Sequence, residues 1–268
     1  MKNKTRFIAV KFVSTKFKKS FPLLVFCVAI HFVLHTQNTF SQWAQISNDM
    51  GTNNNITALA SLGNYIFAGL EGNGVWMSSN NGTNWTQTTL SSNSVLSLAV
   101  SGNKIFAGTV QYGIYVSSDN GVNWNPCLYS ETIICLITRG NYIFAGGTLG
   151  AIFVSSNGGS NWISGGVSGF GVNCFTLLGN NIYAGVSGAN NFELVFQSTN
   201  NGTSWTLTPL VIGQNNHQTI LSLATIGNSI FAGSVDYGIF VSINYSSSWS
   251  KTSLVNKTVH SLVPYNNN

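Results

Sequence analysis

An eight-residue string that ends in tryptophan occurs five times in this chain of 268 residues, about once every 40 residues. The copies read "SSNNGTNW" from Ser78, "SSDNGVNW" from Ser117, "SSNGGSNW" from Ser155, "STNNGTSW" from Ser198 and "SINYSSSW" from Ser242. A fixed period of this length is typical of a repeat architecture, in which each unit buries its apolar faces against its neighbours. The repeat therefore constrains the fold more than any other feature of the sequence.

Three short apolar stretches precede each string. The first stretches read "ITALASLG", "VLSLAVSG", "IICLITRG", "VNCFTLLG" and "ILSLATIG"; the second read "YIFAG", "KIFAG", "YIFAG", "NIYAG" and "SIFAG". The third stretch, such as "GVWMS" from Gly74, leads into the string, whose Trp opens a fourth. Four short strands per unit, separated by Gly and Asn and without helical periodicity, predict an all-β fold, a β-propeller of four-stranded blades.

We expect five complete blades and an incomplete sixth. The complete blades lie at about 56–93, 95–131, 133–170, 172–216 and 220–254. Residues 42–47 resemble a fourth strand and residues 258–264 a first strand, so the termini would share a sixth blade without second and third strands. This predicts a truncated reading frame. Because blades pack face to face, Ile66 and its counterparts should face one neighbour, and Phe67 and its counterparts the other.

The repeated string is predicted to be a structural turn. A short polar side chain at its third position can accept hydrogen bonds from turn amides, Gly at the fifth allows positive φ, and the Trp can cover the hairpin. Four of the five third positions are neutral Asn, whereas a calcium loop needs several carboxylates. We assign a structural role to Ser78, Asn80, Gly82, Trp85, Ser117, Asp119, Gly121, Trp124, Ser155, Asn157, Gly159, Trp162, Ser198, Asn200, Gly202, Trp205, Ser242, Asn244 and Trp249.

The pattern S-x-D-x-G-x-x-W is that of the Asp-box. Over roughly residues 42–264 the chain resembles the BNR/Asp-box repeat β-propellers, a superfamily that includes sialidases, xyloglucanase-type hydrolases, sortilin ectodomains and photosystem II assembly factor-like proteins. The last string departs from the pattern, because Ser246 replaces the Gly. The resemblance implies the propeller fold, and in these families the box lies away from the active site.

A catalytic site cannot be carried over from these families. A sialidase-like site would imply an arginine triad and a Tyr/Glu nucleophile pair, but Arg139 is the only arginine after residue 41. A xyloglucanase-like site would imply two facing carboxylates, and no spacing singles out a pair among Glu71, Glu193 and Asp236. We therefore predict no catalytic residue, with a divergent glycoside hydrolase of sialidase-like or xyloglucanase-like type as the alternative.

Residues 1–41 have the order of a secretory signal peptide. Seven basic residues up to Lys19 precede an apolar run at 21–34, followed by a polar stretch. The run is shorter than the roughly 20 apolar residues that a spanning helix needs. We predict cleavage before Gln42 and a secreted or cell-surface product, the propeller of residues 42–268, with no transmembrane segment.

Cleavage would reverse the charge. The full chain carries a formal charge of +5, but four basic and six acidic residues follow residue 41, a net charge of −2. A nucleic-acid partner would lose its main driving force and is not expected. The three cysteines after residue 41 are odd in number and lack C-x-x-C spacing, which predicts neither a disulfide framework nor a zinc site. No cofactor or metal is expected.

Ligands of propellers usually meet the face made by the loops between strands two and three and between blades. Binding candidates there are Glu71, Tyr112, Asn190, Glu193, Asp236 and Tyr237, and the same loops carry Asn73, Gln111, Glu131, His217 and Gln218. "VQYG" and "VDYG" place Tyr112 and Tyr237 at matching positions, and an insertion around Asn190 lengthens one loop. The sequence thus predicts a non-catalytic module that binds an extracellular polysaccharide or protein.

Overall fold

The computed structural model describes residues 50, 55–167, 171–187, 194–210 and 219–264. Within these ranges the chain forms five four-stranded antiparallel sheets. Blade 1 comprises β1 (Ile56–Leu62), β2 (Tyr65–Leu70), β3 (Gly74–Ser78) and β4 (Thr86–Gln87). Blade 2 comprises β5 (Val95–Ser101), β6 (Lys104–Thr109), β7 (Gly113–Ser117) and β8 (Asn125–Leu128).

The other three blades repeat this order. Blade 3 comprises β9 (Ile133–Arg139), β10 (Tyr142–Gly147), β11 (Ala151–Ser155) and β12 (Ile163–Gly166). Blade 4 comprises β13 (Gly171–Leu178), β14 (Asn181–Ser187), β15 (Leu194–Ser198) and β16 (Thr206–Leu207). Blade 5 comprises β17 (Ile220–Ile226), β18 (Ser229–Ser234), β19 (Gly238–Ser242) and β20 (Ser250–Lys251). In the described part of the chain, no helix is long and apolar enough to cross a membrane.

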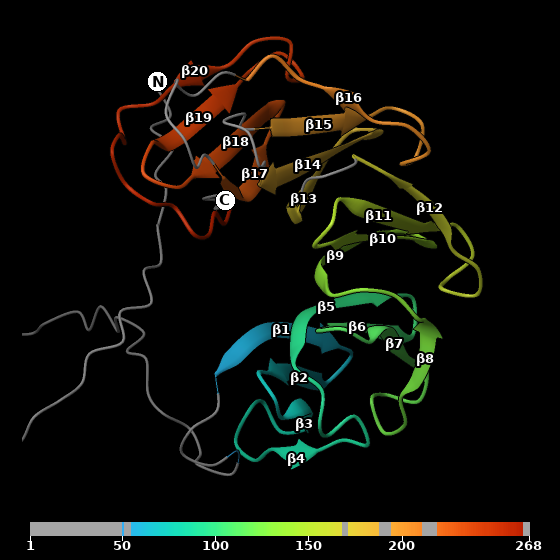
Figure 1. Ribbon diagram of the computed structural model, residues 1–268. Helices are drawn as coiled ribbons and strands as arrows, with labels where there is room; N and C mark the ends of the chain where they lie inside the picture. Colours follow the sequence, from blue (N-terminus) through green and yellow to red (C-terminus); the bar gives the residue numbers. More distant parts are fainter. Residues whose placement is uncertain (1–49, 51–54, 168–170, 188–193, 211–218, 265–268) are drawn as a thin grey trace, which may run out of the picture.

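The blades follow one another in an arc around a common axis, with the first strand of each blade innermost (Figure 1). The predicted all-β propeller with five complete blades is confirmed. Among the described residues the arc is open between blade 1 and blade 5 (Figure 1). The predicted fourth strand at 42–47 and the signal peptide at 1–41 lie outside the described residues and stay predictions. Residues 258–264, predicted as a first strand, do not form a strand, because no described residue pairs with them in a ladder.

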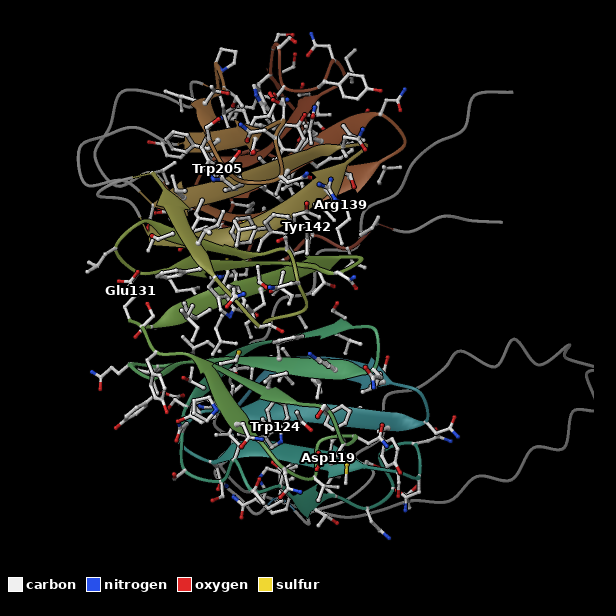
Figure 2. All side chains as sticks on the ribbon, turned by 90° about the vertical axis from the view of Figure 1, so that its right-hand side faces the viewer. Asp119, Trp124, Glu131, Arg139, Tyr142 and Trp205 are labelled. Carbon is white, nitrogen blue, oxygen red and sulfur yellow. The ribbon has the colours of Figure 1, made fainter. Side chains whose placement is uncertain are left out.

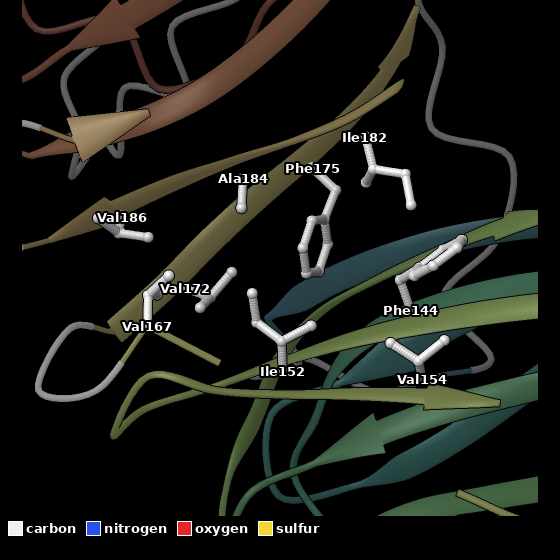
Figure 3. Packing of buried hydrophobic residues seen from close by; sticks show 9 residues of the cluster. All are labelled: Phe144, Ile152, Val154, Val167, Val172, Phe175, Ile182, Ala184 and Val186. Atoms are coloured by element: carbon white, nitrogen blue, oxygen red, sulfur yellow. The ribbon is translucent and has the colours of Figure 1, made fainter. Parts of the chain in front are cut away.

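Apolar side chains from adjacent blades form one core cluster at each of the four interfaces. Phe67 of blade 1 and Ile105 of blade 2 belong to the same cluster and are fully buried. Between blades 3 and 4, Phe144 meets Ile182 and Phe175 in the same way (Figure 3). The predicted alternation is thus correct: the aromatic residue of each second strand faces the next blade, and the isoleucine before it faces the previous one.

The glycine that ends each "AG" pair lies in close contact with the first β-branched residue of the next blade. A Cβ at Gly69 would lie 2.6 Å from Val95 Cγ1, which is too close for real atoms. The same contact recurs along the arc, between Gly108 and Ile133, Gly146 and Val172, Gly185 and Ile220, and Gly233 and Val259. Glycine is therefore needed here for close approach, because the first β-branched residue of the next blade fills the space.

Substitution of Gly69 gives the first prediction. We expect Gly69→Ala to destabilise the protein by about 1–3 kcal/mol, because the added methyl group overpacks the interface. Val95→Ala removes the Cγ1 atom that the methyl would meet, so the double variant should lose less stability than the two single variants together. Urea denaturation of the four proteins measures this coupling, and strictly additive losses would contradict the assigned contact.

Candidate functional site

The two ends of the blades differ in what they expose. One end carries the β2–β3 type turns and the connections between blades, here called the loop face (71–73, 91–94, 110–112, 129–132, 147–150, 235–237 and 255–258). The other end carries the repeated strings, here called box hairpins, and forms the box face. In Figure 2, Glu131 lies at the loop-face edge, whereas Arg139 and Asp119 lie toward the opposite end.

Each box hairpin is a hydrogen-bonded turn. In blade 2, the Ser117 hydroxyl donates to Asp119 Oδ1 (2.7 Å) and accepts from the Gly121 amide (2.9 Å). Asp119 Oδ1 also accepts from the Asn123 amide (2.9 Å). The same three bonds recur in the other strings with Asn as the acceptor, on Asn80, Asn157, Asn200 and Asn244. The turn therefore needs an oxygen acceptor and does not need a charge.

In three of the strings, the remaining side-chain atom of the third residue, Oδ2 of Asp or Nδ2 of Asn, forms a hydrogen bond with the side chain of the seventh residue. Asp119 Oδ2 accepts from Asn123 Nδ2 (2.8 Å). Asn200 Nδ2 instead donates to Ser204 Oγ (2.7 Å), and the last box hairpin repeats this arrangement. Hydrogen bonds from Asn123 and Ser117 lower the pKa of Asp119 from 3.8 to about 2. Asp119 is thus ionised at neutral pH, although its position tolerates Asn in the other blades.

The box hairpins also connect neighbouring blades. A Cβ at Gly121, whose φ is +82°, would lie 2.2 Å from Phe67 Cε1 of the preceding blade. Lys104 Nζ of blade 2 donates to the Gly158 carbonyl in the box hairpin of blade 3 (3.0 Å). Arg139 likewise donates to the Asn180 carbonyl (2.9 Å) and to the Asn201 side chain. The single arginine after residue 41 is therefore committed to an inter-blade contact on the box face.

The last box hairpin lacks glycine but keeps the same turn. Ser246 has φ +70°, and its amide donates to the Ser242 hydroxyl (2.9 Å). Its own hydroxyl donates to Gln197 Oε1 of blade 4 (3.0 Å). A hydrogen bond to the preceding blade thus accompanies the change from glycine to serine.

On the loop face, the turns between the second and third strands of blades 1, 2 and 5 are each capped by a hydroxyl from the segment that follows the same blade. The Ser94 hydroxyl accepts from the Gly72 amide (2.8 Å), Thr132 from Gln111 (3.0 Å), and Thr258 from Asp236 (3.2 Å). Gln111 and Asp236 have φ of 66° and 61°. They therefore occupy the same left-handed position of the turn.

Two of the predicted binding carboxylates make local hydrogen bonds. Asp236 accepts from the Thr258 hydroxyl (2.8 Å), and Glu71 accepts from Asn55 Nδ2 (3.0 Å). Both residues are exposed, on blade 5 and blade 1, which are the last and first blades of the arc. Glu193 and Asn190, the other polar candidates, lie outside the described residues, as do His217 and Gln218.

The two tyrosines at matching positions have different surroundings. Tyr112 is 55% exposed. Tyr237 is partly buried against the cluster between blades 4 and 5, and Lys251 Nζ lies 5.6 Å from the centre of its ring. A cation at this distance interacts with the ring face. Only Tyr112 of the pair therefore presents a largely exposed ring.

Tyr112 lies on the loop face of blades 2 and 3 together with two other exposed side chains and the partly buried Glu131. We call Tyr112, Tyr129, Glu131 and Leu149 the tyrosine patch; Tyr129 is 78% and Leu149 75% exposed. Their three loops are joined by backbone contacts. Thr148 N donates to Thr132 O (3.2 Å). Gly113, which follows Tyr112, lies so close to the next loop that a Cβ there would be 2.0 Å from Leu128 O and 2.8 Å from Ser130 N.

Glu131 is the acidic member of the tyrosine patch. Its Oε2 accepts from the Thr148 hydroxyl (3.3 Å), whereas its buried Oε1 has no hydrogen-bond partner among the described residues. The side chain fits because position 147 is glycine: a Cβ there would lie 2.2 Å from Oε1. One oxygen of the Glu131 carboxylate is therefore buried without a hydrogen-bond donor among the described residues.

Tyr129 and Leu149 were not among the residues predicted from the sequence. A signal was present, because Leu149 occupies the turn position that carries Gly72, Gln111 or Asp236 in other blades, where no large apolar side chain occurs. Tyr129 lies on a connection between blades, "LYSET", where the repeat has no fixed residue. Tyr129 and Leu149 come near Tyr112 only through the packing of blade 2 against blade 3.

The cysteines are free thiols in the described part of the chain. Desolvation raises the pKa of Cys127 and of Cys174 to about 12, and it raises the pKa of Cys135 well above its ordinary value. These thiols therefore stay protonated at neutral pH and are poor nucleophiles. Within the described ranges, no group of three or more His, Cys, Asp or Glu side chains could hold a metal ion.

The chain is similar in fold to several known proteins. A family model described as a DUF6242 beta propeller domain matches residues 25–132. The GH74 xyloglucanase from Xanthomonas campestris is 15% identical, with a TM-score of 0.59 over 73% of this chain and 38% of that chain. The extracellular domain of the two component system BT4673 from B. thetaiotaomicron is 18% identical, with a TM-score of 0.59 over 77% and 30%. YCF48 bound to D1 peptide is 12% identical, with a TM-score of 0.50 over 76% and 84%.

These similarities confirm the β-propeller predicted from the repeat, and at these identities they show the fold alone. The chain spans only 38% of the xyloglucanase and 30% of the BT4673 domain. None of the curated proteins matches the chain. The family match begins at residue 25, inside the predicted signal peptide.

The box hairpin in blade 2 gives the second prediction. Trp124 is 8% exposed, and its indole N–H donates to the Gly121 carbonyl (3.0 Å). Trp124→Ala should cost about 3–5 kcal/mol of stability, because it leaves a cavity at the interface of blades 1 and 2. Asp119→Asn should leave stability at neutral pH nearly unchanged, because Asn keeps the Oδ1 acceptor. Urea denaturation measures both, and equal losses would contradict the structural role of the box.

The third prediction concerns acid stability. The folded-state pKa of Asp119, about 2, lies below the ordinary 3.8, so its ionised form stabilises the fold above about pH 4 and this contribution is lost as pH falls through about 2. Asp119→Asn has no such titration. The urea midpoint of the wild type should therefore fall more steeply between about pH 4 and pH 2 than that of the variant. Parallel pH profiles of the two proteins would rule out the contribution.

Proposed function

We propose that this protein is a non-catalytic binding module that acts outside the cell and holds a polysaccharide or a protein on its loop face. The observation that carries the proposal is the tyrosine patch, in which two tyrosines and a leucine are more than half exposed on three joined loops. Exposed apolar and aromatic side chains that gather on one surface are typical of binding sites.

A neutral polysaccharide is the ligand that fits this surface best. Tyrosine rings offer apolar faces on which sugar rings can stack, and each phenol can form hydrogen bonds with hydroxyl groups. The Glu131 carboxylate can accept a hydrogen bond from a sugar hydroxyl through Oε2, the atom that meets Thr148 at the surface, since Oε1 is buried. Leu149 would also suit a protein ligand, so binding of a protein instead of a polysaccharide is one outcome of the test.

Hydrolysis of the ligand is not part of the proposal. Cleavage of a glycosidic bond needs an acid and a base placed on either side of the bond, within about 5–10 Å of each other. Glu71 and Asp236 belong to the first and last blades and are each hydrogen-bonded locally, and Glu131 is the only carboxylate in the tyrosine patch. Similarity to a GH74 xyloglucanase supports the same fold without supplying this pair.

Action outside the cell rests on two observations. The first is the predicted signal peptide at residues 1–41, with its basic start and apolar run. The second is the similarity in fold to the extracellular domain of BT4673. N-terminal sequencing of the exported protein tests this part, and a mature protein that begins at Met1 would contradict it.

The fourth prediction tests the tyrosine patch. Immobilised polysaccharides should retain the wild type, and Tyr129→Ala or Tyr112→Ala should weaken retention about tenfold or more, because hot-spot aromatic residues contribute 1–2 kcal/mol or more. Tyr245→Ala is the matched control, since Tyr245 is 47% exposed on the box face. Reducing-end release is assayed in parallel.

Three outcomes would overturn the proposal or part of it. Product formation that Asp236→Asn or Glu71→Gln abolishes would make the protein a hydrolase. Loss of retention with Tyr237→Ala but not with Tyr129→Ala would move the site away from the tyrosine patch. Retention that is equal for all tyrosine variants would remove the loop face from binding altogether.

A further inference from the structure

The chain contains five Asn–Gly pairs, a dipeptide that is chemically labile. They lie at 73–74, 81–82, 120–121, 157–158 and 201–202, all within the described ranges. In such a pair the glycine amide nitrogen can attack the side-chain carbonyl carbon of the asparagine, because glycine has no Cβ to hinder the approach. The side-chain nitrogen leaves as ammonia, and water opens the resulting succinimide to aspartate or isoaspartate. Each pair is therefore a site at which deamidation can occur.

Three of the pairs lie in box hairpins, where the backbone of the turn favours them. The asparagine at the fourth position of the string has φ of 56° in blade 1 and 58° in blades 2 and 4. The glycine that follows has φ of 80–82°. Asparagine and glycine adopt a positive φ more readily than other residues. The conformation that closes the hairpin thus selects a labile pair.

The first serine of the string holds the nitrogen atom that would attack. The glycine amide donates to the serine hydroxyl at 2.9 Å in blades 1 and 2 and at 2.8 Å in blade 4. The three glycines are buried, and Ser78, Ser117 and Ser198 are each 1% exposed. An amide fixed on a buried hydroxyl is not free to turn toward the asparagine side chain, and the water that the reaction consumes is excluded from it.

The preceding blade fixes the same glycine from the other side. A Cβ at Gly121 would lie 2.2 Å from Phe67 Cε1, and one at Gly202 would lie 2.8 Å from Val154 Cγ2. This close packing leaves the peptide unit after the asparagine little room to rotate. The hydrogen bond and the packing therefore act on the same peptide unit.

The two remaining pairs have a backbone acceptor in place of the serine. The Gly74 amide donates to the Asn93 carbonyl (2.9 Å), and the Gly158 amide donates to the Asn141 carbonyl (3.0 Å). The glycine amide is thus hydrogen-bonded in all five pairs. Only in the box hairpins of blades 1, 2 and 4 is the acceptor a side chain, which a single substitution removes.

We propose that the first serine of these three box hairpins protects the Asn–Gly pair from deamidation, in addition to its part in the turn. This role is independent of the proposed ligand site on the loop face. Ser242 has no such role, because Tyr245 and Ser246 replace the pair in blade 5. Isoaspartate at position 120 would add one carbon atom to the main chain between Ser117 and Gly121, and so would disrupt the hydrogen bond that closes the turn.

The experiment compares Ser117→Ala and Ser78→Ala in the full chain. Each protein is incubated in mildly alkaline buffer, and peptide mass spectrometry follows the conversion of amide to carboxyl at each pair. Ser117→Ala should raise the deamidation rate at Asn120 about tenfold, because a buried amide without its acceptor makes local opening more frequent. The rates at Asn81 and Asn201 in the same chain should stay unchanged. Ser78→Ala should accelerate deamidation at Asn81 alone.

Val172→Ala is the control for a general loss of stability, since Val172 is fully buried in the cluster between blades 3 and 4. It should not raise the rate at Asn120 above the rates at Asn81 and Asn201. An unchanged rate at Asn120 in Ser117→Ala, or an equal rise at all three pairs, would overturn the proposal.

A second comparison covers the case in which a serine variant does not fold. A peptide that copies residues 115–126 presents the same Asn–Gly pair without the hairpin packing. The folded wild type should deamidate Asn120 at least about tenfold more slowly than this peptide, because reaction requires local opening of the hairpin. Equal rates in the peptide and the folded protein would show that the hairpin gives no protection.

Discussion

The contact between a glycine and a β-branched residue at each blade interface is the constraint on which the rest of this structure depends. It brings the inner strand of one blade against the second strand of the blade before it, and it recurs from Gly69 and Val95 to Gly233 and Val259. Because the contact leaves no room for a Cβ, each blade has one position relative to its neighbour. The apolar clusters then fill the remaining space and supply most of the burial energy.

The two ends of the blades differ in structure: one carries contacts that join successive blades, and the other carries side chains that vary from blade to blade. On the box face, hydrogen bonds within each hairpin and contacts such as Arg139 to Asn201 join successive blades. On the loop face, the caps by Ser94, Thr132 and Thr258 hold the turns, but the side chains beyond them vary from blade to blade. A surface that varies over a fixed frame can acquire a ligand site without loss of stability, and the tyrosine patch has this character.

The fold was largely predictable from sequence because every blade repeats the same local pattern. The alternation of Ile66 and Phe67 placed the two faces of each blade correctly, and the neutral Asn residues in the boxes indicated a structural turn. The binding candidates were less predictable. Tyr112 and Tyr237 occupy equivalent positions in sequence, yet Lys251 and the core between blades 4 and 5 cover part of Tyr237. The Asp236 carboxylate accepts a hydrogen bond from the Thr258 hydroxyl and so holds the turn that contains it.

By itself, the sequence determined the all-β class, the blade period, the order of strands within a blade and the structural use of the repeated string, because these follow from local turn chemistry and the alternation of side chains along a strand. Only the tertiary structure decided which exposed residues lie on neighbouring loops and which apolar face no described residue covers. Tyr112, Tyr129 and Leu149 lie on three separate loops, and Ile56 resembles Val95 in every local respect. Val95 is covered by the blade before it, whereas no described residue covers Ile56, and such contacts depend on packing between segments distant in the chain.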